Sequence, residues 1–177
     1  FVFTPNGDLK SLPKDATPLD FSFSIHTEIG MKTRGAKVNG KLVPLNHVLQ
    51  SGDQVDIITS ENAKPTSNWL DYVTTTRAKS KIKSSLKEDK KTIAVDGKEI
   101  LRRKLKQLKI NLNERSINEL VNYFKLNTSL DLFYRVGIGS IDNTMLKNFA
   151  TSRSNALVSY IKNKITRTKS PTKVAVE

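Results

Sequence analysis

The chain has 177 residues, enough for one medium domain or two small ones, and it carries a formal net charge of +13. It contains no cysteine, which excludes disulfide bonds, zinc sites ligated by cysteine and thiol nucleophiles. No apolar run approaches the roughly 18 residues needed to cross a bilayer, and no signal peptide precedes the first expected strand. We therefore expect a folded cytoplasmic protein. Because it starts at Phe1 without a methionine, we expect it to be a piece of a longer protein.

Short strands and tight turns are expected in the first sixty residues. The Asn6-Gly7 and Asn39-Gly40 pairs are typical hairpin turns. Strands are predicted at residues 1–4, 9–12, 35–38, 42–45 and 55–58. A helix is expected between them, with Thr17 as its N-cap, Pro18 in its first turn and Gly30 at its end. This order predicts an α+β fold of the β-grasp (ubiquitin-like) type.

Beyond residue 60 the apolar spacing becomes helical. Ala78, Ile82 and Leu86 recur at every fourth position, and a second set follows at Leu101, Leu105 and Leu108. Further helices are expected from a capping box at Ser116 and Glu119, from Thr128, from Asp142, and over residues 154–165. We therefore predict a β-grasp domain at residues 1–62, an all-α domain at 63–165, and a disordered tail or linker at 166–177.

The positive charge belongs to the second part. Residues 1–60 contain six basic and six acidic side chains, whereas the rest contains 24 basic and 11 acidic ones. A surplus of this size attracts phosphate backbones, anionic membranes or acidic proteins, although it can also serve only solubility.

The first sixty residues resemble a TGS domain, the β-grasp module of threonyl-tRNA synthetases, certain GTPases and RelA/SpoT-type guanosine tetraphosphate (ppGpp) synthetase/hydrolases. The matching motifs are Phe3-Thr4-Pro5, Thr17-Pro18-Leu19-Asp20-Phe21, Ile25-His26-Thr27-Glu28-Ile29-Gly30, Gly35-Ala36-Lys37-Val38-Asn39-Gly40 and Gly52-Asp53-Gln54-Val55. Trp69-Leu70 and the run from Val73 to Ile82 then resemble the stretch that leaves this domain in RelA/SpoT homologues. The later helices are similar to the helical domain of that family, mainly in their spacing.

The resemblance implies the regulatory half of a stringent-response enzyme, without the half that makes or hydrolyses the alarmone. It implies a module that senses starvation by binding the acceptor end of uncharged tRNA on the ribosome, with ribosomal RNA as a further contact. The alternative is a protein-interaction module that docks acyl carrier protein or the catalytic domains of the parent chain. Dimerisation through the helices is a third possibility. No cofactor and no membrane partner are expected.

His26 is the first candidate for binding tRNA. Its imidazole can bond a ribose hydroxyl and stack on a base, and Lys32 and Arg34 follow with charges suited to phosphates. The motif match implies that His26 meets the tRNA 3′ end, where a free hydroxyl would enter and an esterified amino acid would clash. From helix spacing alone, His26 could instead cap the helix or face the core.

Four further candidates, Arg77, Lys79, Lys81 and Lys83, lie on the first long helix. Ala78 and Ile82 would hold one side of that helix down and leave the cations for phosphate, although an ordinary solvated face would look the same.

No catalytic site or metal site is expected. His26 and His47 are the only histidines, and neither precedes an aspartate. A phosphate-binding loop ending in Gly-Lys-Ser/Thr is missing. The sequence around Gly137-Ile138-Gly139 superficially matches a helix-hairpin-helix, but the simpler interpretation is a tight turn between helices in which glycine supplies positive φ.

Overall fold

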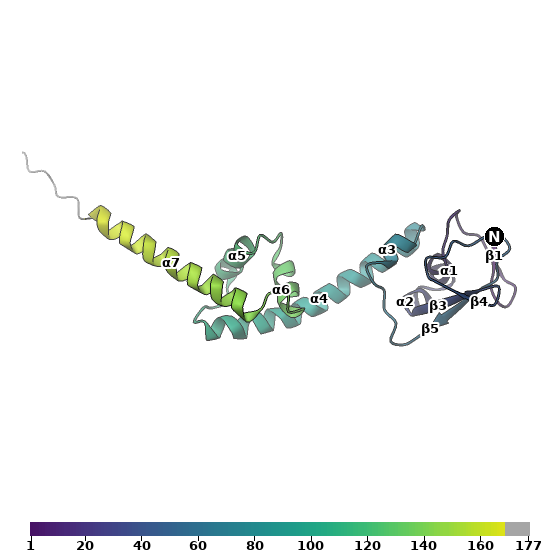
Figure 1. Cartoon of the computed structure of the whole chain (residues 1–177), viewed down its shortest axis with the longest axis horizontal. Coiled ribbons are helices and arrows are strands. Elements are labelled where there is room, and N and C mark those ends of the chain that lie inside the picture. The colour runs from purple at the N-terminus through teal and green to yellow at the C-terminus, as the bar shows by residue number, and fades with distance from the viewer. Residues whose placement is uncertain (169–177) are drawn as a thin grey trace, which may run out of the picture. The chain divides into compact units, whose positions relative to one another are not determined.

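The computed structural model describes residues 1–168 (Figure 1). The chain divides into two compact units, Phe1–Asp89 and Lys90–Glu177, and the boundary falls inside one helix, α4 (Thr76–Gln107). The last helix, α7 (Asn143–Thr168), includes the first three residues of the expected tail, and the rest of that tail lies outside the described residues. Each unit is described separately below.

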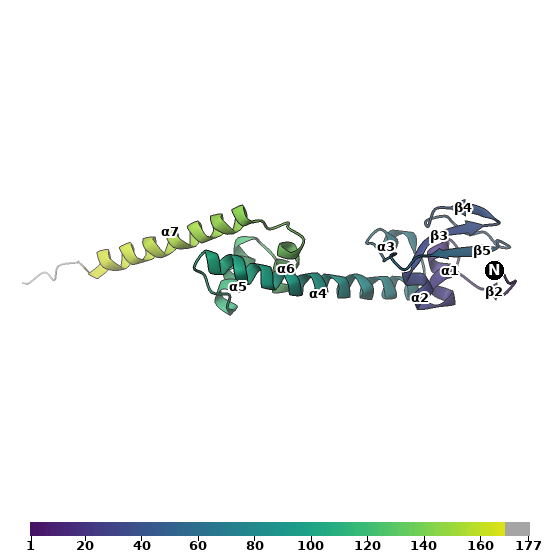
Figure 2. The ribbon, with the colours of Figure 1, turned by 90° about the horizontal axis from the view of Figure 1, so that it is seen from below.

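The strands of the first unit form two small sheets. Strands β1 (Val2–Phe3) and β2 (Leu9–Lys10) pair antiparallel. Strand β3 (Thr33–Val38) lies between β4 (Lys41–Val43) and β5 (Val55–Thr59), antiparallel to both (Figure 2). A parallel bridge between Phe3 and Gln54 joins the two sheets. This arrangement confirms the predicted β-grasp fold.

The helix expected to end at Gly30 is two helices, α1 (Pro18–Ile25) and α2 (Thr27–Met31), separated by His26. Thr17 and Pro18 begin α1 as predicted. The prediction for Gly30 was wrong, because Gly30 lies inside α2 with its Cα against the ring of Phe23. A Cβ at that position would lie 2.4 Å from the ring. Gly30 is therefore required for close packing and does not end a helix.

Helix α1 is buried on two sides. One side packs on the sheets in a cluster formed by Val2, Phe21, Val38 and Val55. The other side is covered by α3 (Trp69–Tyr72) and the start of α4, in a cluster formed by Leu19, Phe23, Trp69, Val73, Ala78 and Ile82. The segment that follows the sheets is therefore part of the first unit, and Trp69 is buried in its core.

The second unit consists of the remainder of α4 with α5 (Glu114–Tyr123), α6 (Ser129–Gly137) and α7. Its core contains Leu101, Leu105, Ile110, Leu120, Leu132, Val136, Ile141, Leu146 and Phe149. The two helices expected around Ala78 and Leu101 are one continuous helix, α4. The two expected from Asp142 and over residues 154–165 are likewise one helix, α7. Thr128 and Asp142 accept backbone amides at the starts of α6 and α7, as predicted.

Two boundaries in this unit differ from the prediction. The cap of α5 is Asn113, whose Oδ1 accepts the amide of Ser116 at 2.9 Å, so Ser116 is the third residue of the helix and not its cap. In the turn after α6, only Gly139 has positive φ, at +80°. Gly137 allows close approach instead: a Cβ there would lie 2.7 Å from the carbonyl oxygen of Ile93 in α4.

Candidate nucleic-acid interface

His26 lies at the junction of α1 and α2. Its backbone is extended (φ −157°, ψ 143°), and its amide donates to the carbonyl of Ser22 at the end of α1. Its Nδ1 accepts the amide of Glu28 at 3.2 Å, which caps α2. Because Nδ1 is an acceptor, the neutral ring carries its proton on Nε2. The side chain is exposed, so the imidazole is both a helix cap and a surface group.

Lys32 is engaged by two carboxylates. Its Nζ lies 2.8 Å from Glu28 and 3.0 Å from Glu61, which follows β5. Glu28 and Glu61 raise the pKa of Lys32, and Lys32 in turn lowers the pKa of Glu28. Glu28 thus links His26 and Lys32, since its amide donates to the His26 ring and its carboxylate pairs with Lys32. A phosphate that binds Lys32 has to compete with both carboxylates.

Arg34 lies beside an apolar hollow on the outer face of the three-stranded sheet. The hollow has a volume of about 280 Å³. Besides Arg34 it is lined by Gly35, Leu42, Val43, Pro44, Leu45 and Ile58. Leu42 is 72% exposed there. Arg34 itself is exposed and falls at the irregularity where the register of β3 against β5 shifts. A guanidinium next to exposed apolar side chains can hold a phosphate while a base covers the apolar surface.

The cations of α4 form two groups. Lys79, Lys83 and Lys87 follow one another at every fourth residue, so they lie in one row along the helix. With Thr76, Ser80 and Ser84 they line a shallow hollow of about 460 Å³. Arg77 and Lys81 are also exposed. They flank the buried Ala78 and Ile82 on one side of the helix, whereas the three lysines of the row flank them on the other side. The four predicted residues therefore do not share one surface, and Lys87 joins the row of lysines.

Asp20 has a larger role than the sequence indicated. Its carboxylate is buried and accepts from Thr17, as expected of a capping residue, at 3.0 Å. It also accepts the amides of Thr74 (3.1 Å) and Thr75 (2.9 Å) and both threonine hydroxyls, immediately before α4. Burial acts to raise the pKa of Asp20, but the bonds from Thr75, Thr17 and Thr74 together hold it below its ordinary value. Asp20 thereby fixes the start of the lysine-bearing helix onto α1.

Comparison with known families assigns the two parts of the chain. Residues 1–59 match the TGS domain, and residues 86–148 match the RelA/SpoT AH domain. The chain belongs to the RelA/SpoT family. The chain is 43% identical over 147 residues to a guanosine-3′,5′-bis(diphosphate) 3′-pyrophosphohydrolase of Aquifex aeolicus, covering 82% of the chain and 21% of that relative.

Two other relatives are named GTP pyrophosphokinase. One, from Escherichia coli K12, is 39% identical over 160 residues, covering 88% of the chain and 21% of the relative. The other, from Myxococcus xanthus, is 43% identical over 114 residues, covering 64% of the chain and 15% of the relative. The chain thus spans between 15% and 21% of the length of these RelA/SpoT relatives, and its TGS and AH domains are of the regulatory type.

Within the described part of this RelA/SpoT chain, no cluster of three or more histidine, cysteine, aspartate or glutamate residues is arranged to hold a metal ion. Over the same residues, no helix combines the length and apolarity required for a membrane span.

Proposed function

We propose that this chain is a non-catalytic regulatory module that senses uncharged tRNA on the ribosome. His26 of the TGS domain binds the acceptor end, Arg34 binds a phosphate from the outer face of the sheet, and the row formed by Lys79, Lys83 and Lys87 binds a tRNA or ribosomal RNA backbone. The geometry of His26 is the main support for this proposal. Because Nδ1 is used by the cap of α2, the ring has a fixed orientation and offers its Nε2–H as a donor to a terminal ribose hydroxyl.

The lysine row supports the backbone contact. Its three ammonium groups are spaced along the helix with hydroxyl groups between them, and lysine and serine side chains are usual partners of phosphate oxygens. These contacts carry no sequence information. They supply affinity and salt dependence, whereas His26 supplies the discrimination between free and esterified 3′ ends.

The first test substitutes His26→Asn. Asparagine is a good N-cap, so α2 keeps its cap while the Nε2–H is lost. We expect affinity for uncharged tRNA to fall about three- to ten-fold, the value of one hydrogen bond, in filter binding with the 177-residue chain. His47→Asn, in the loop before β5, is the matched control and should leave affinity unchanged. Equal affinity of the wild-type chain for uncharged and aminoacylated tRNA would remove the claim of discrimination.

The second test measures the salt dependence of the same binding. Replacing Lys79, Lys83 and Lys87 together by glutamine should lower the slope of log affinity against log salt by about 2 to 3, because each lysine releases about one counterion. The paired control, Arg77→Gln with Lys81→Gln on the other side of α4, tests whether that side also contacts the backbone. An unchanged slope in the triple variant would contradict the assignment of the row.

A second function is favoured by the exposed apolar surface next to Arg34. Leu42, Pro44 and Ile58 would be covered by a docking protein, such as acyl carrier protein or the catalytic domains of the parent chain. Leu42→Ser should then weaken the binding of such a protein and leave the affinity for uncharged tRNA unchanged. If Leu42→Ser weakened tRNA binding and not protein binding, the surface would instead be assigned to a nucleotide of the tRNA.

A further inference from the structure

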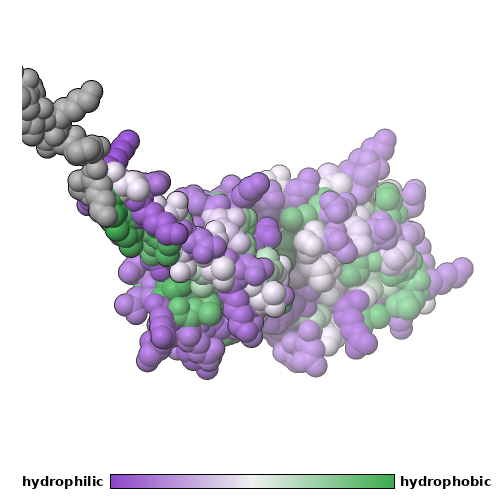
Figure 3. Space-filling model, turned by 60° about the vertical axis from the view of Figure 1, so that its left-hand side comes forward, coloured by the Kyte–Doolittle hydropathy of each residue, from purple (hydrophilic) through white to green (hydrophobic). Residues whose placement is uncertain are grey.

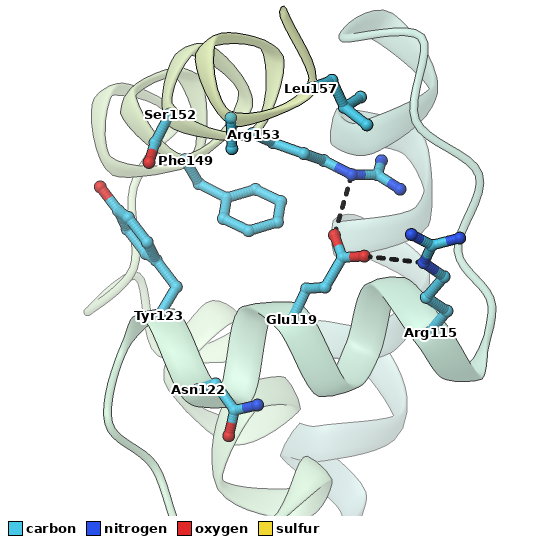
Figure 4. Close-up of a pocket in the computed structure, with 9 residues that line it drawn as sticks. Arg115, Glu119, Asn122, Tyr123, Phe149, Ser152, Arg153 and Leu157 are labelled. Carbon is cyan, nitrogen blue, oxygen red and sulfur yellow. Dashed lines mark hydrogen bonds and ion pairs between the residues drawn. The ribbon is translucent and has the colours of Figure 1, made fainter. Parts of the chain in front are cut away.

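The second unit has a groove between α5 and α7, and none of the residues proposed to bind tRNA lines it. Its volume is about 730 Å³ (Figure 4). Tyr123 and Phe149 form its aromatic end, with their ring centroids 5.3 Å apart. At the other end Glu119 accepts from Arg115 at 3.1 Å and from Arg153 at 2.8 Å. The groove is therefore apolar at one end and cationic at the other, since two guanidinium groups share one carboxylate.

The apolar lining continues along α7 beyond the groove. Leu157, Val158, Ile161 and Ile165 fall within an arc of about 100° on the helix. We call these four residues the α7 stripe. They are between 49% and 54% exposed. Figures 1 and 2 show this part of α7 extending past α5 and α6, and Figure 3 shows apolar atoms gathered along it. Four adjacent aliphatic side chains at this exposure mark an interaction surface.

The charge of α7 indicates what covers the stripe. Between Asn143 and Thr168 the helix has five basic residues and no acidic one. A second copy of the same helix would therefore be repelled. RNA would satisfy the cations but leave the aliphatic stripe uncovered, and a flat bilayer surface would not fill the concave groove. An acidic amphipathic helix would match all three features, because it has apolar residues for the stripe, a side chain for the groove and carboxylates for the cations.

We propose that the α5–α7 groove and the α7 stripe form a docking site for an acidic amphipathic helix of another protein. The partner helix lies along α7 and places apolar residues at i, i+3, i+4 and i+7 on Leu157, Ile161 and Ile165. One large apolar side chain enters the groove against Phe149. Its glutamate or aspartate residues face Lys162 and Arg167 on the two flanks of the stripe.

The test uses a labelled synthetic peptide of eighteen residues, with leucine at the four apolar positions and glutamate at the flanks. Its binding to the 177-residue chain is measured by fluorescence anisotropy. The double variant Leu157→Ser with Ile161→Ser should weaken binding at least about ten-fold, because both side chains are covered in the complex. Val95→Ser, at an exposed apolar residue of α4, is the matched control and should bind like the wild type.

Four results would overturn the proposal. A peptide with lysine in place of glutamate should not bind, and equal binding by it would show that charge does not select the partner. Unchanged binding in the double variant, with helix content verified by circular dichroism, would show that the stripe is not the site. Displacement of the acidic peptide by an equal concentration of single-stranded RNA, or self-association of the chain that the double variant abolishes, would assign the surface to RNA or to a second copy.

Discussion

Substitution of Asp20 is the sharpest test of how the TGS domain holds the start of α4. In Asp20→Asn the side chain keeps its size but loses its charge and exchanges one acceptor oxygen for a donor group. The amides and hydroxyls of Thr74 and Thr75 all donate to the two carboxylate oxygens, so half of this set would then face an NH2 group. The perturbation therefore removes hydrogen bonds while leaving the packing of α1 intact.

The expected loss follows from those bonds. Hydrogen bonds to a charged group contribute about 1.5–3 kcal/mol, and a buried donor left unsatisfied costs about 1–3 kcal/mol. Because asparagine retains one acceptor, we expect the free energy of unfolding to fall by about 2–4 kcal/mol at pH 7. The pKa of Asp20 is lowered in the folded state, so this stabilisation is present above its ordinary value of 3.8 and is lost as pH falls through the folded-state pKa.

The assay is guanidinium denaturation followed by the fluorescence of Trp69, the single tryptophan, which packs in the same cluster as α1 and α4. The difference between Asp20→Asn and wild type should be constant from pH 7 to pH 5 and shrink in more acidic buffer. Asp56→Asn, at an exposed position of β5, should change stability by less than about 0.5 kcal/mol. A difference for Asp20→Asn as small as that control would refute the reasoning.

Three further outcomes follow from local geometry. Gly97→Ala should destabilise the AH domain by about 2 kcal/mol or more in thermal unfolding, because the new Cβ would lie 1.8 Å from the carbonyl oxygen of Phe133. Alanine favours an isolated helix over glycine, so a stabilised variant would contradict the close crossing of α4 and α6. Asn113→Ala should cost about 1 kcal/mol by the same measurement, through loss of the cap of α5, whereas Asn113→Ser should be nearly neutral. Glu61→Gln should free part of the charge of Lys32 and raise tRNA affinity by up to about five-fold, an effect that should disappear in high salt.

The fold of the first unit was predictable from local signals. The two Asn-Gly pairs and the Thr17-Pro18 helix start act over a few residues, and all of them occur in the structure. Gly30 was misjudged because its role depends on the ring of Phe23, which lies seven residues away and faces it only after α1 and α2 have turned at His26. Local spacing carries no information about such an approach.

In the candidate site, too, features set by local spacing were predictable and features set by contacts distant in the sequence were not. Exposure of the cations on α4 followed from the helical spacing of Ala78 and Ile82. The partners of Lys32 did not, since Glu61 is 29 residues away and reaches Lys32 only through the pairing of β3 with β5. Likewise, the bonds from Asp20 to Thr74 and Thr75 could not be predicted, because they span more than fifty residues.

The shared cluster of α1 with α3 and α4 determines where this protein can be divided. A fragment that stops at residue 59, where the TGS match ends, would leave Leu19 and Phe23 without Trp69 and Ile82. The bare side of α1 would then be in contact with water, and such a fragment should aggregate during purification. A fragment that continues through residue 89 retains the whole cluster, so dissection of related proteins should place the cut within the long helix and not at the end of the sheet.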